Sequence, residues 1–167
     1  MTISPLPWEE NDPAAWVDAL SDREALVMGA GICMYQAGKT APRPSRANLR
    51  LVHDAPAPIL LFLRMVRLMG AERSALRYRL TVGRPSHADE AARWWADLVG
   101  VQAALIQRRV RNSRPALAAR REIGGLDRGL FAVEVLDSGA LYLKIDGIVR
   151  EILGTIVDRE ERPDDRG

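Results

Sequence analysis

The segment LRYRLTV, residues 76 to 82, carries an apolar side chain at every even-numbered position and a polar one at every odd-numbered position. Because successive side chains of a strand point to opposite faces, this period of two predicts a strand with one buried face and one face in solvent. The solvent face holds Arg77 and Arg79. The segment ANLRLVH, residues 47 to 53, repeats the pattern with Arg50 on its outer face. The sequence therefore predicts a sheet with one basic, uncovered face.

Helical patterns separate these strands. Ser21 and Glu24 form a capping-box pattern at the start of a helix, and Asp12 followed by Pro13 predicts a shorter helix before it. The main predicted helices cover residues 22–36, 54–70, 88–98 and 139–153. Two further strands are predicted at residues 107–112 and 130–135, joined as a hairpin by a loop over residues 113–125.

The predicted order is helix, strand, helix, strand, helix, strand, strand, helix. Short strands mixed with helices in this way favour an α+β fold, in which helices cover one side of an antiparallel sheet and leave the other side open. At 167 residues the chain is long enough for one hydrophobic core. We expect an acidic N-terminal extension over residues 1–20, one domain over residues 21–154 and a disordered charged tail over residues 155–167.

Several classes of protein are disfavoured by the composition. The longest apolar run, Ile59 to Leu63, is too short to cross a bilayer, and the N-terminus lacks the pattern of a signal peptide. We therefore expect a cytoplasmic protein without a membrane partner. The single cysteine, Cys33, cannot form an internal disulfide or a multi-cysteine metal site, and it is interpreted as a small buried side chain.

The helix predicted over residues 22–36 is apolar on nearly all sides and contains two glycines. A helix of this kind is buried, and its small residues allow another helix to approach closely. Two interpretations follow: the helix lies in the core of one chain, or it packs on its copy across a two-fold axis. We favour the second, a homodimer. The predicted interface residues are Val27, Gly29, Ala30, Gly31 and Met34.

Charge is distributed unevenly along a chain whose net charge is only +2. Residues 1–24 hold six acids and one base, residues 39–121 hold 17 bases and five acids, and residues 122–167 hold eleven acids and six bases. No acid occurs between Glu24 and Asp54. A basic middle between acidic ends favours an anionic partner, although folding can also interleave the three segments into an evenly mixed surface.

Several strings, in their order, resemble the LAGLIDADG endonuclease-like domains, in the compact single-motif form of bacterial, especially actinobacterial, proteins. They begin with GAGICMYQAGK and LRLVHDAPAPILLFLRMVRLMGA. They continue with LRYRLTVGRPSHADEAARWWADLVGV, IQRR and LFAVEVLDSGALYLKIDGIV. Together they span about residues 22 to 153, most of the chain.

The resemblance implies a saddle-shaped antiparallel sheet that lays its open face on DNA, and a signature helix that packs on its twin. In that family the signature helix ends in an acid that holds divalent metals for phosphodiester hydrolysis. Gln36 stands at that position here, and its neutral carbonyl is a poor ligand for Mg²⁺. We therefore expect no catalytic residue, no bound metal and no cofactor.

Nothing else in the sequence indicates an enzyme. His53 and His87 are far apart, and no zinc-binding or nucleophile motif occurs. The predicted function is non-catalytic, regulatory binding of double-stranded DNA by a homodimer. The predicted DNA-binding residues are Arg43, Arg46, Arg50, Arg77, Arg79, Arg108, Arg109, Arg111, Arg114, Arg120 and Arg121.

Two alternatives stay open. The chain can be a protein-interaction module that uses its apolar helix to join an unidentified protein partner, with no role on nucleic acid. The weaker alternative is a divalent-metal-dependent DNA endonuclease that uses other acids.

Overall fold

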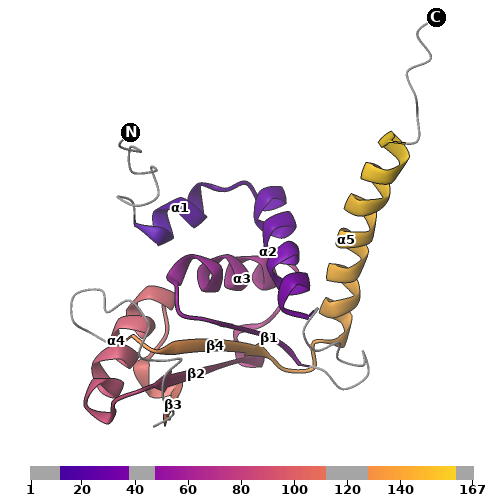
Figure 1. Ribbon diagram of the computed structural model, residues 1–167. Helices are drawn as coiled ribbons and strands as arrows, with labels where there is room; N and C mark the ends of the chain where they lie inside the picture. Colours follow the sequence, from indigo (N-terminus) through magenta and orange to yellow (C-terminus); the bar gives the residue numbers. More distant parts are fainter. Residues whose placement is uncertain (1–11, 38–47, 112–127, 161–167) are drawn as a thin grey trace, which may run out of the picture.

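The computed structural model describes residues 12–37, 48–111 and 128–160. Figure 1 shows a curved sheet with helices gathered over one of its faces, and none of the helices in these ranges covers the opposite face. The α+β class is confirmed. The helices are α1 (Pro13–Ala19), α2 (Asp22–Ala37), α3 (Pro56–Leu68), α4 (Ala88–Val99) and α5 (Gly139–Glu160). The strands are β1 (Leu49–His53), β2 (Leu76–Val82), β3 (Ile106–Val110) and β4 (Leu130–Val135).

The four strands form one sheet in the order β1-β4-β2-β3. β4 lies between β1 and β2 and is antiparallel to both, whereas β2 and β3 are parallel. The prediction of an entirely antiparallel sheet is therefore wrong for this pair. β2 and β3 are parallel because α4 carries the chain from the end of β2 back along the sheet, so that β3 runs in the same direction as β2.

The predicted hairpin of the third and fourth strands is also wrong. β3 lies at the edge of the sheet, and β2 separates it from β4. The connection over residues 111–129 is much longer than the two to five residues of a typical hairpin loop. A connection of this length lets the chain pass β2 before β4 begins. The predicted loop over residues 113–125 lies outside the described residues.

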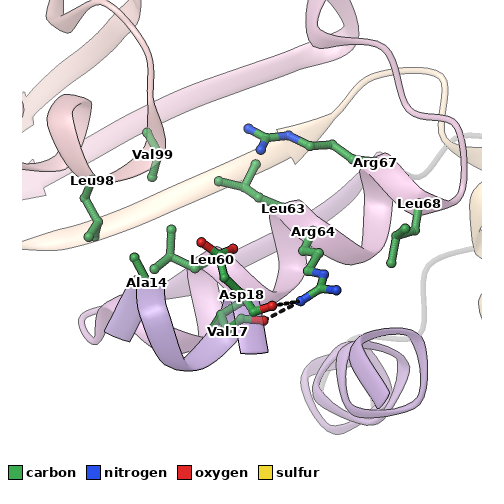
Figure 2. A pocket seen from close by; sticks show the side chains of 10 residues that line it. All are labelled: Ala14, Val17, Asp18, Leu60, Leu63, Arg64, Arg67, Leu68, Leu98 and Val99. Carbon is green, nitrogen blue, oxygen red and sulfur yellow. Dashed lines mark hydrogen bonds between the residues drawn. The ribbon is translucent and has the colours of Figure 1, made fainter. Parts of the chain in front are cut away.

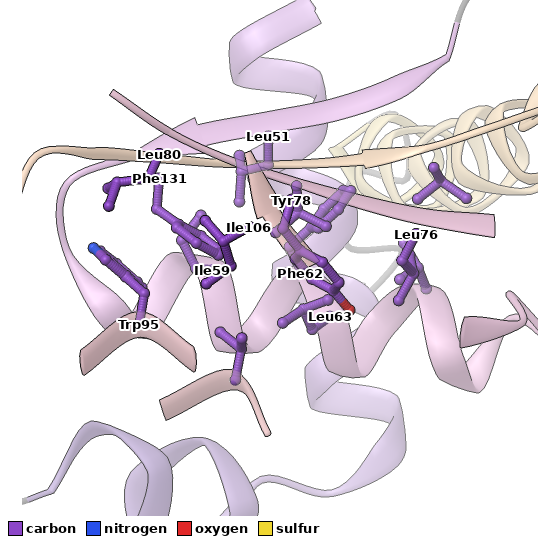
Figure 3. Packing of buried hydrophobic residues seen from close by; sticks show 14 of the residues in the cluster. Leu51, Ile59, Phe62, Leu63, Leu76, Tyr78, Leu80, Trp95, Ile106 and Phe131 are labelled. Atoms are coloured by element: carbon purple, nitrogen blue, oxygen red, sulfur yellow. The ribbon is translucent and has the colours of Figure 1, made fainter. Parts of the chain in front are cut away.

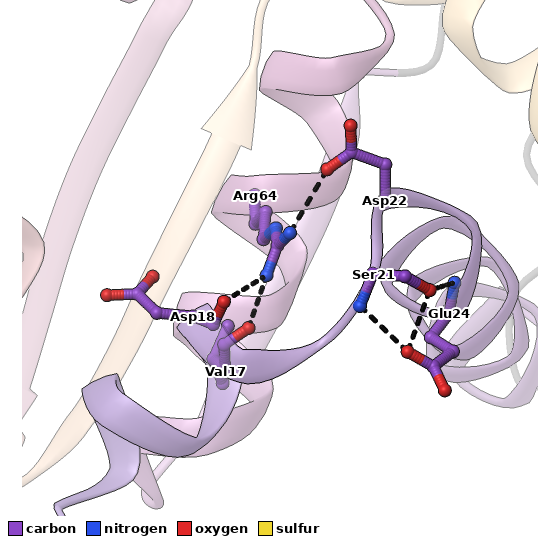
Figure 4. Close-up of polar contacts among 6 residues, drawn as sticks. All are labelled: Val17, Asp18, Ser21, Asp22, Glu24 and Arg64. Atoms are coloured by element: carbon purple, nitrogen blue, oxygen red, sulfur yellow. Dashed lines mark hydrogen bonds and ion pairs between the residues drawn. The ribbon is translucent and has the colours of Figure 1, made fainter.

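The capping box at the start of α2 is confirmed (Figure 4). The backbone N–H of Ser21 donates to the Glu24 carboxylate at 2.7 Å, and the backbone N–H of Glu24 donates to the Ser21 hydroxyl at 3.2 Å. The Ser21 hydroxyl also donates to the same carboxylate, and these bonds lower the pKa of Glu24. Asp12 caps α1 as predicted, accepting a hydrogen bond from the N–H of Ala14.

The core lies between the helices and the inner face of the sheet (Figure 3). Trp95 of α4 stacks on Phe131 of β4 with their ring centroids 4.5 Å apart. Phe62 of α3 and Leu51 of β1 are almost wholly buried in the same cluster. Burial of such side chains contributes about 1.5 to 3 kcal/mol each. This one core holds all four strands to the helical layer.

The C-terminal helix is longer than predicted. α5 runs from Gly139 to Glu160, so the proposed tail boundary at residue 155 falls inside a helix. Residues 161–167 lie outside the described residues, as do residues 1–11 of the predicted N-terminal extension. No helix in the described ranges is long and apolar enough to cross a membrane.

Candidate nucleic-acid interface

The face of the sheet opposite the helices carries most of its charge as arginine. Apolar residues alternate inward along β2, so the residues between them face outward, and the pairing register places their strand partners on the same face. This outer face is formed by Arg50 and Val52 of β1, Leu130, Ala132 and Glu134 of β4, Arg77, Arg79 and Thr81 of β2, and Gln107 and Arg109 of β3. We call it the open face.

The register brings three of these charges into one row. Glu134 pairs with Arg50 on one side and with Arg77 on the other. The Glu134 carboxylate also accepts a hydrogen bond of 3.0 Å from the Asn48 side chain. Opposite charges on neighbouring strands attract by about 0.2 to 1 kcal/mol per pair. The carboxylate therefore offsets part of the positive charge at this end of the open face.

Arg79 and Arg109 lie farther along the sheet. Arg109 is exposed and pairs with Thr81, whereas Arg79 is half-buried and pairs with Ala132 and Gln107. The Nε atom of Arg79 is buried without a hydrogen-bond partner among the described atoms. Leaving a buried donor of this kind unpaired is costly.

Arg77 differs in how its guanidinium is used. One terminal nitrogen donates to the carbonyl oxygens of Ser74 and Leu76, at 2.7 and 2.9 Å. These bonds turn the guanidinium toward the start of β2. Arg77 thus lies on the open face but is partly engaged by the backbone.

Arg108 lies on the other side of the sheet. It pairs with Leu80, a core residue, so its side chain is on the helix-covered face. There it forms an ion pair of 3.0 Å with Asp89 of α4. The expectation that Arg108 shares a DNA-facing surface is therefore wrong. Its position follows from alternation, because Ile106 of the same strand is buried.

The remaining predicted arginines divide into two groups. Arg111 is exposed just beyond β3, and its backbone N–H donates to the Val82 carbonyl oxygen at 3.0 Å, extending the parallel pairing. The other predicted arginines lie outside the described residues, and they are Arg43, Arg46, Arg114, Arg120 and Arg121.

Arg128 is a cation that the sequence analysis did not single out. Its guanidinium carbon lies 3.8 Å from the centroid of a Trp94 ring, a cation–π contact. Its carbonyl oxygen accepts a hydrogen bond of 2.8 Å from the indole of Trp95. Both contacts are to α4, so Arg128 tethers the start of β4 to that helix. No local pattern around Arg128 indicates this pairing.

No family model matches this chain, and neither does any curated protein or solved structure. The LAGLIDADG-like assignment therefore stays a prediction. Gln36, the residue at the expected position of the catalytic acid, falls in the last turn of α2, and its side chain lies outside the described part of the structure.

His53 and Cys33 have structural positions. The Nδ1 atom of His53 accepts a hydrogen bond of 2.9 Å from the N–H of Ala55 at the start of α3, and it lies 3.3 Å from the Asp54 carboxylate. Cys33 is buried, and burial raises the pKa of its thiol to about 12. In the ranges that the structure describes, no three histidine, cysteine or acidic side chains gather as a possible metal site.

The predicted interface residues of α2 fall on two sides of the helix. Ala30 is fully buried in the core of the same chain. A Cβ atom on Gly29 would lie 2.7 Å from the sulfur of Met65 in α3. These two residues therefore belong to the contact between α2 and α3, contrary to their predicted place between two copies. Val27 is 39% exposed, Gly31 faces open space and Met34 is half-buried.

The two glycines of α2 should respond oppositely to alanine. We expect Gly29→Ala to lower the free energy of unfolding by about 1 to 3 kcal/mol, because the added methyl group overpacks the contact with Met65. We expect Gly31→Ala to raise it by up to about 1 kcal/mol, because alanine favours the helix and meets no neighbour. Urea denaturation of both variants measures the difference, and equal shifts would contradict the assignment of Gly29 to the core.

Proposed function

We propose that this protein is a non-catalytic DNA-binding protein, regulatory in role, that presents the open face of its sheet to duplex DNA. The observation that carries the proposal is the placement of Arg50, Arg77, Arg79 and Arg109 on one face across three strands. Phosphate contacts by arginine supply most of the affinity in non-specific DNA binding. The order of helices and strands supports a LAGLIDADG-like fold, although the parallel pair of β2 and β3 departs from the antiparallel sheet of that family.

The dimensions of the open face suit a nucleic-acid groove. Strands in a sheet are about 4.8 Å apart, so Arg50 on β1 and Arg77 on β2 are separated by about 10 Å across β4. The major groove of B-DNA is about 12 Å wide. Arg109 on the edge strand β3 extends the positive charge by one further strand. Glu134 lies within this surface and would repel phosphate, so the affinity of the natural sequence is below what the arginines alone allow.

The proposal includes a homodimer formed through α2. After Gly29 and Ala30 are assigned to the core, the surface of α2 still exposes Val27, Met28 and Gly31. Gly31 is four residues from Val27 and three from Met28, so it lies beside both on the helix surface. An apolar strip with a glycine at its centre allows a second helix to approach closely.

The DNA-binding proposal predicts a specific change in salt dependence. A variant with Arg50, Arg79 and Arg109 replaced by Gln should bind a random-sequence duplex at least about tenfold more weakly, because it loses charged hydrogen bonds to phosphate. The slope of log K against log salt should become shallower by about 2 to 3, because each phosphate contact contributes about 0.9. Fluorescence anisotropy at several salt concentrations measures both quantities, and two chains bound per site would support the dimer.

Two controls sharpen this test. A variant with Arg23, Arg93 and Arg150 replaced by Gln loses the same charge from helical surfaces away from the open face. Its salt slope should match that of the natural sequence. Glu134→Gln should bind more tightly, because it removes the carboxylate from the open face. Equal losses in the two triple variants, or no binding by the natural sequence, would refute the proposal.

A further inference from the structure

A groove opens on the helical side of the molecule, away from the open face. It lies between α1, α3 and α4 and has a volume of about 440 Å³, within the range of about 300 to 1,000 Å³ that is usual for small-ligand sites. Figure 2 shows its lining. Leu60 and Leu63 of α3 and Leu98 and Val99 of α4 give it an apolar wall. The groove can therefore hold an apolar body of small-molecule size.

Two opposite charges line the same groove. Asp18 of α1 and Arg67 of α3 are both exposed and both belong to the lining. In Figure 2 the two side chains extend from different helices, and the Arg67 guanidinium reaches over Leu63 toward Val99. No ion pair joins Asp18 or Arg67 to another residue in the described ranges. Each charge is therefore accessible to a ligand.

The other charged residue of the lining, Arg64, is already engaged. It donates to the carbonyl oxygens of Val17 and Asp18 at the end of α1 and forms an ion pair of 3.0 Å with Asp22 (Figures 2 and 4). These contacts hold α1 against α3. Arg64 thus shapes the groove, whereas Arg67 is the cation that a ligand can reach.

The positive charge of Arg67 also acts on the core residue Tyr78. Burial raises the pKa of the Tyr78 hydroxyl, and the nearby charge of Arg67 offsets part of that rise.

We propose that the groove binds a small zwitterion with an apolar body, of the size of an apolar amino acid or dipeptide. The ligand carboxylate would pair with Arg67, its ammonium group with Asp18, and its apolar side chains would cover Leu60, Leu63 and Leu98. A simple organic anion would meet the Asp18 carboxylate, and a simple cation would meet Arg67. A ligand that carries both charges satisfies both groups, and the site is independent of DNA binding.

The dipeptide L-leucyl-L-leucine is the probe for this site. Isothermal titration calorimetry of the full chain should show saturable binding of one dipeptide per chain. Arg67→Gln and Asp18→Asn should each weaken binding about tenfold or more, because each removes one charged hydrogen bond. Bound dipeptide should also raise the melting temperature of the natural sequence, because it binds only the folded state.

Modified dipeptides identify which group meets which charge. The C-terminal amide should bind the natural sequence and Arg67→Gln equally, and the N-acetyl dipeptide should bind the natural sequence and Asp18→Asn equally. Arg93→Gln and Asp97→Asn, on α4 outside the lining, are matched controls and should bind the unmodified dipeptide normally. The proposal is overturned if the natural sequence shows no saturable binding. It is also overturned if the two lining variants bind the unmodified dipeptide as the controls do. The same holds if Arg67→Gln binds the amide, or Asp18→Asn the N-acetyl dipeptide, more weakly than the natural sequence does.

Discussion

Replacement of Trp95 by alanine is expected to lower the free energy of unfolding by about 3 to 5 kcal/mol. Trp95 is fully buried, stacks on Phe131 with an interplanar angle of 10°, and donates its indole N–H to the carbonyl oxygen of Arg128. Alanine leaves a cavity between α4 and β4 and leaves that carbonyl without its donor. Urea denaturation followed by circular dichroism measures the loss.

The adjacent tryptophan supplies a matched control. Trp94 is half-buried, meets Trp95 edge-on and stacks with Arg128. Trp94→Ala should therefore cost only about 1 to 2 kcal/mol, from partial burial and one cation–π contact. Equal losses of stability in the two variants would contradict the placement of Trp95 in the core and of Trp94 at its margin.

Replacement of Gly129 by alanine has the second largest expected effect, a loss of about 2 to 5 kcal/mol. Gly129 has φ of +67°, a conformation that disfavours any residue with a Cβ atom. An added Cβ would also lie 2.4 Å from the carbonyl oxygen of Thr81. Backbone atoms cannot rotate away from such a contact, so β4 would have to move from β2. Thermal and urea denaturation measure the effect.

Gly100 separates the two contributions. It ends α4 with a similar φ of +70°, but a Cβ there would meet no atom within 4 Å. Gly100→Ala should cost only the conformational strain, about 1 to 2 kcal/mol. The difference between the two variants is the contribution of the contact with Thr81. A difference near zero would show that β4 and β2 are not packed as closely as the structure indicates.

The helices and strands themselves were predictable because their signals are local. Alternation along residues 76–82 gave the strand β2, and the bonds between Ser21 and Glu24 confirm the start of α2. The face occupied by Arg108 was also available from sequence, since alternation from Ile106 places it inward. The outward positions of Arg50, Arg77 and Arg79 were predicted by the same rule.

The arrangement of the strands was not predictable in this way. Which strands become neighbours depends on contacts between residues that are distant in sequence. The pattern of residues 130–135 predicts a strand but does not indicate that β4 pairs with β1 and β2. The roles of Gly29 and Gly31 were equally hidden, because a helix that is apolar on every side does not reveal which side meets α3. The groove between α1, α3 and α4 combines residues from three separate helices, so no single motif indicates it.

The central position of β4 has a consequence for biosynthesis. β4 is the last strand of the described residues, yet it is the one that joins β1 to β2. Until residues 130–135 have been translated, β1 and β2 both lack their partner β4, and each presents an unpaired backbone edge. Completion of the sheet must wait for β4 to emerge, and a product truncated before residue 130 would leave these strand edges free to pair with other chains and aggregate.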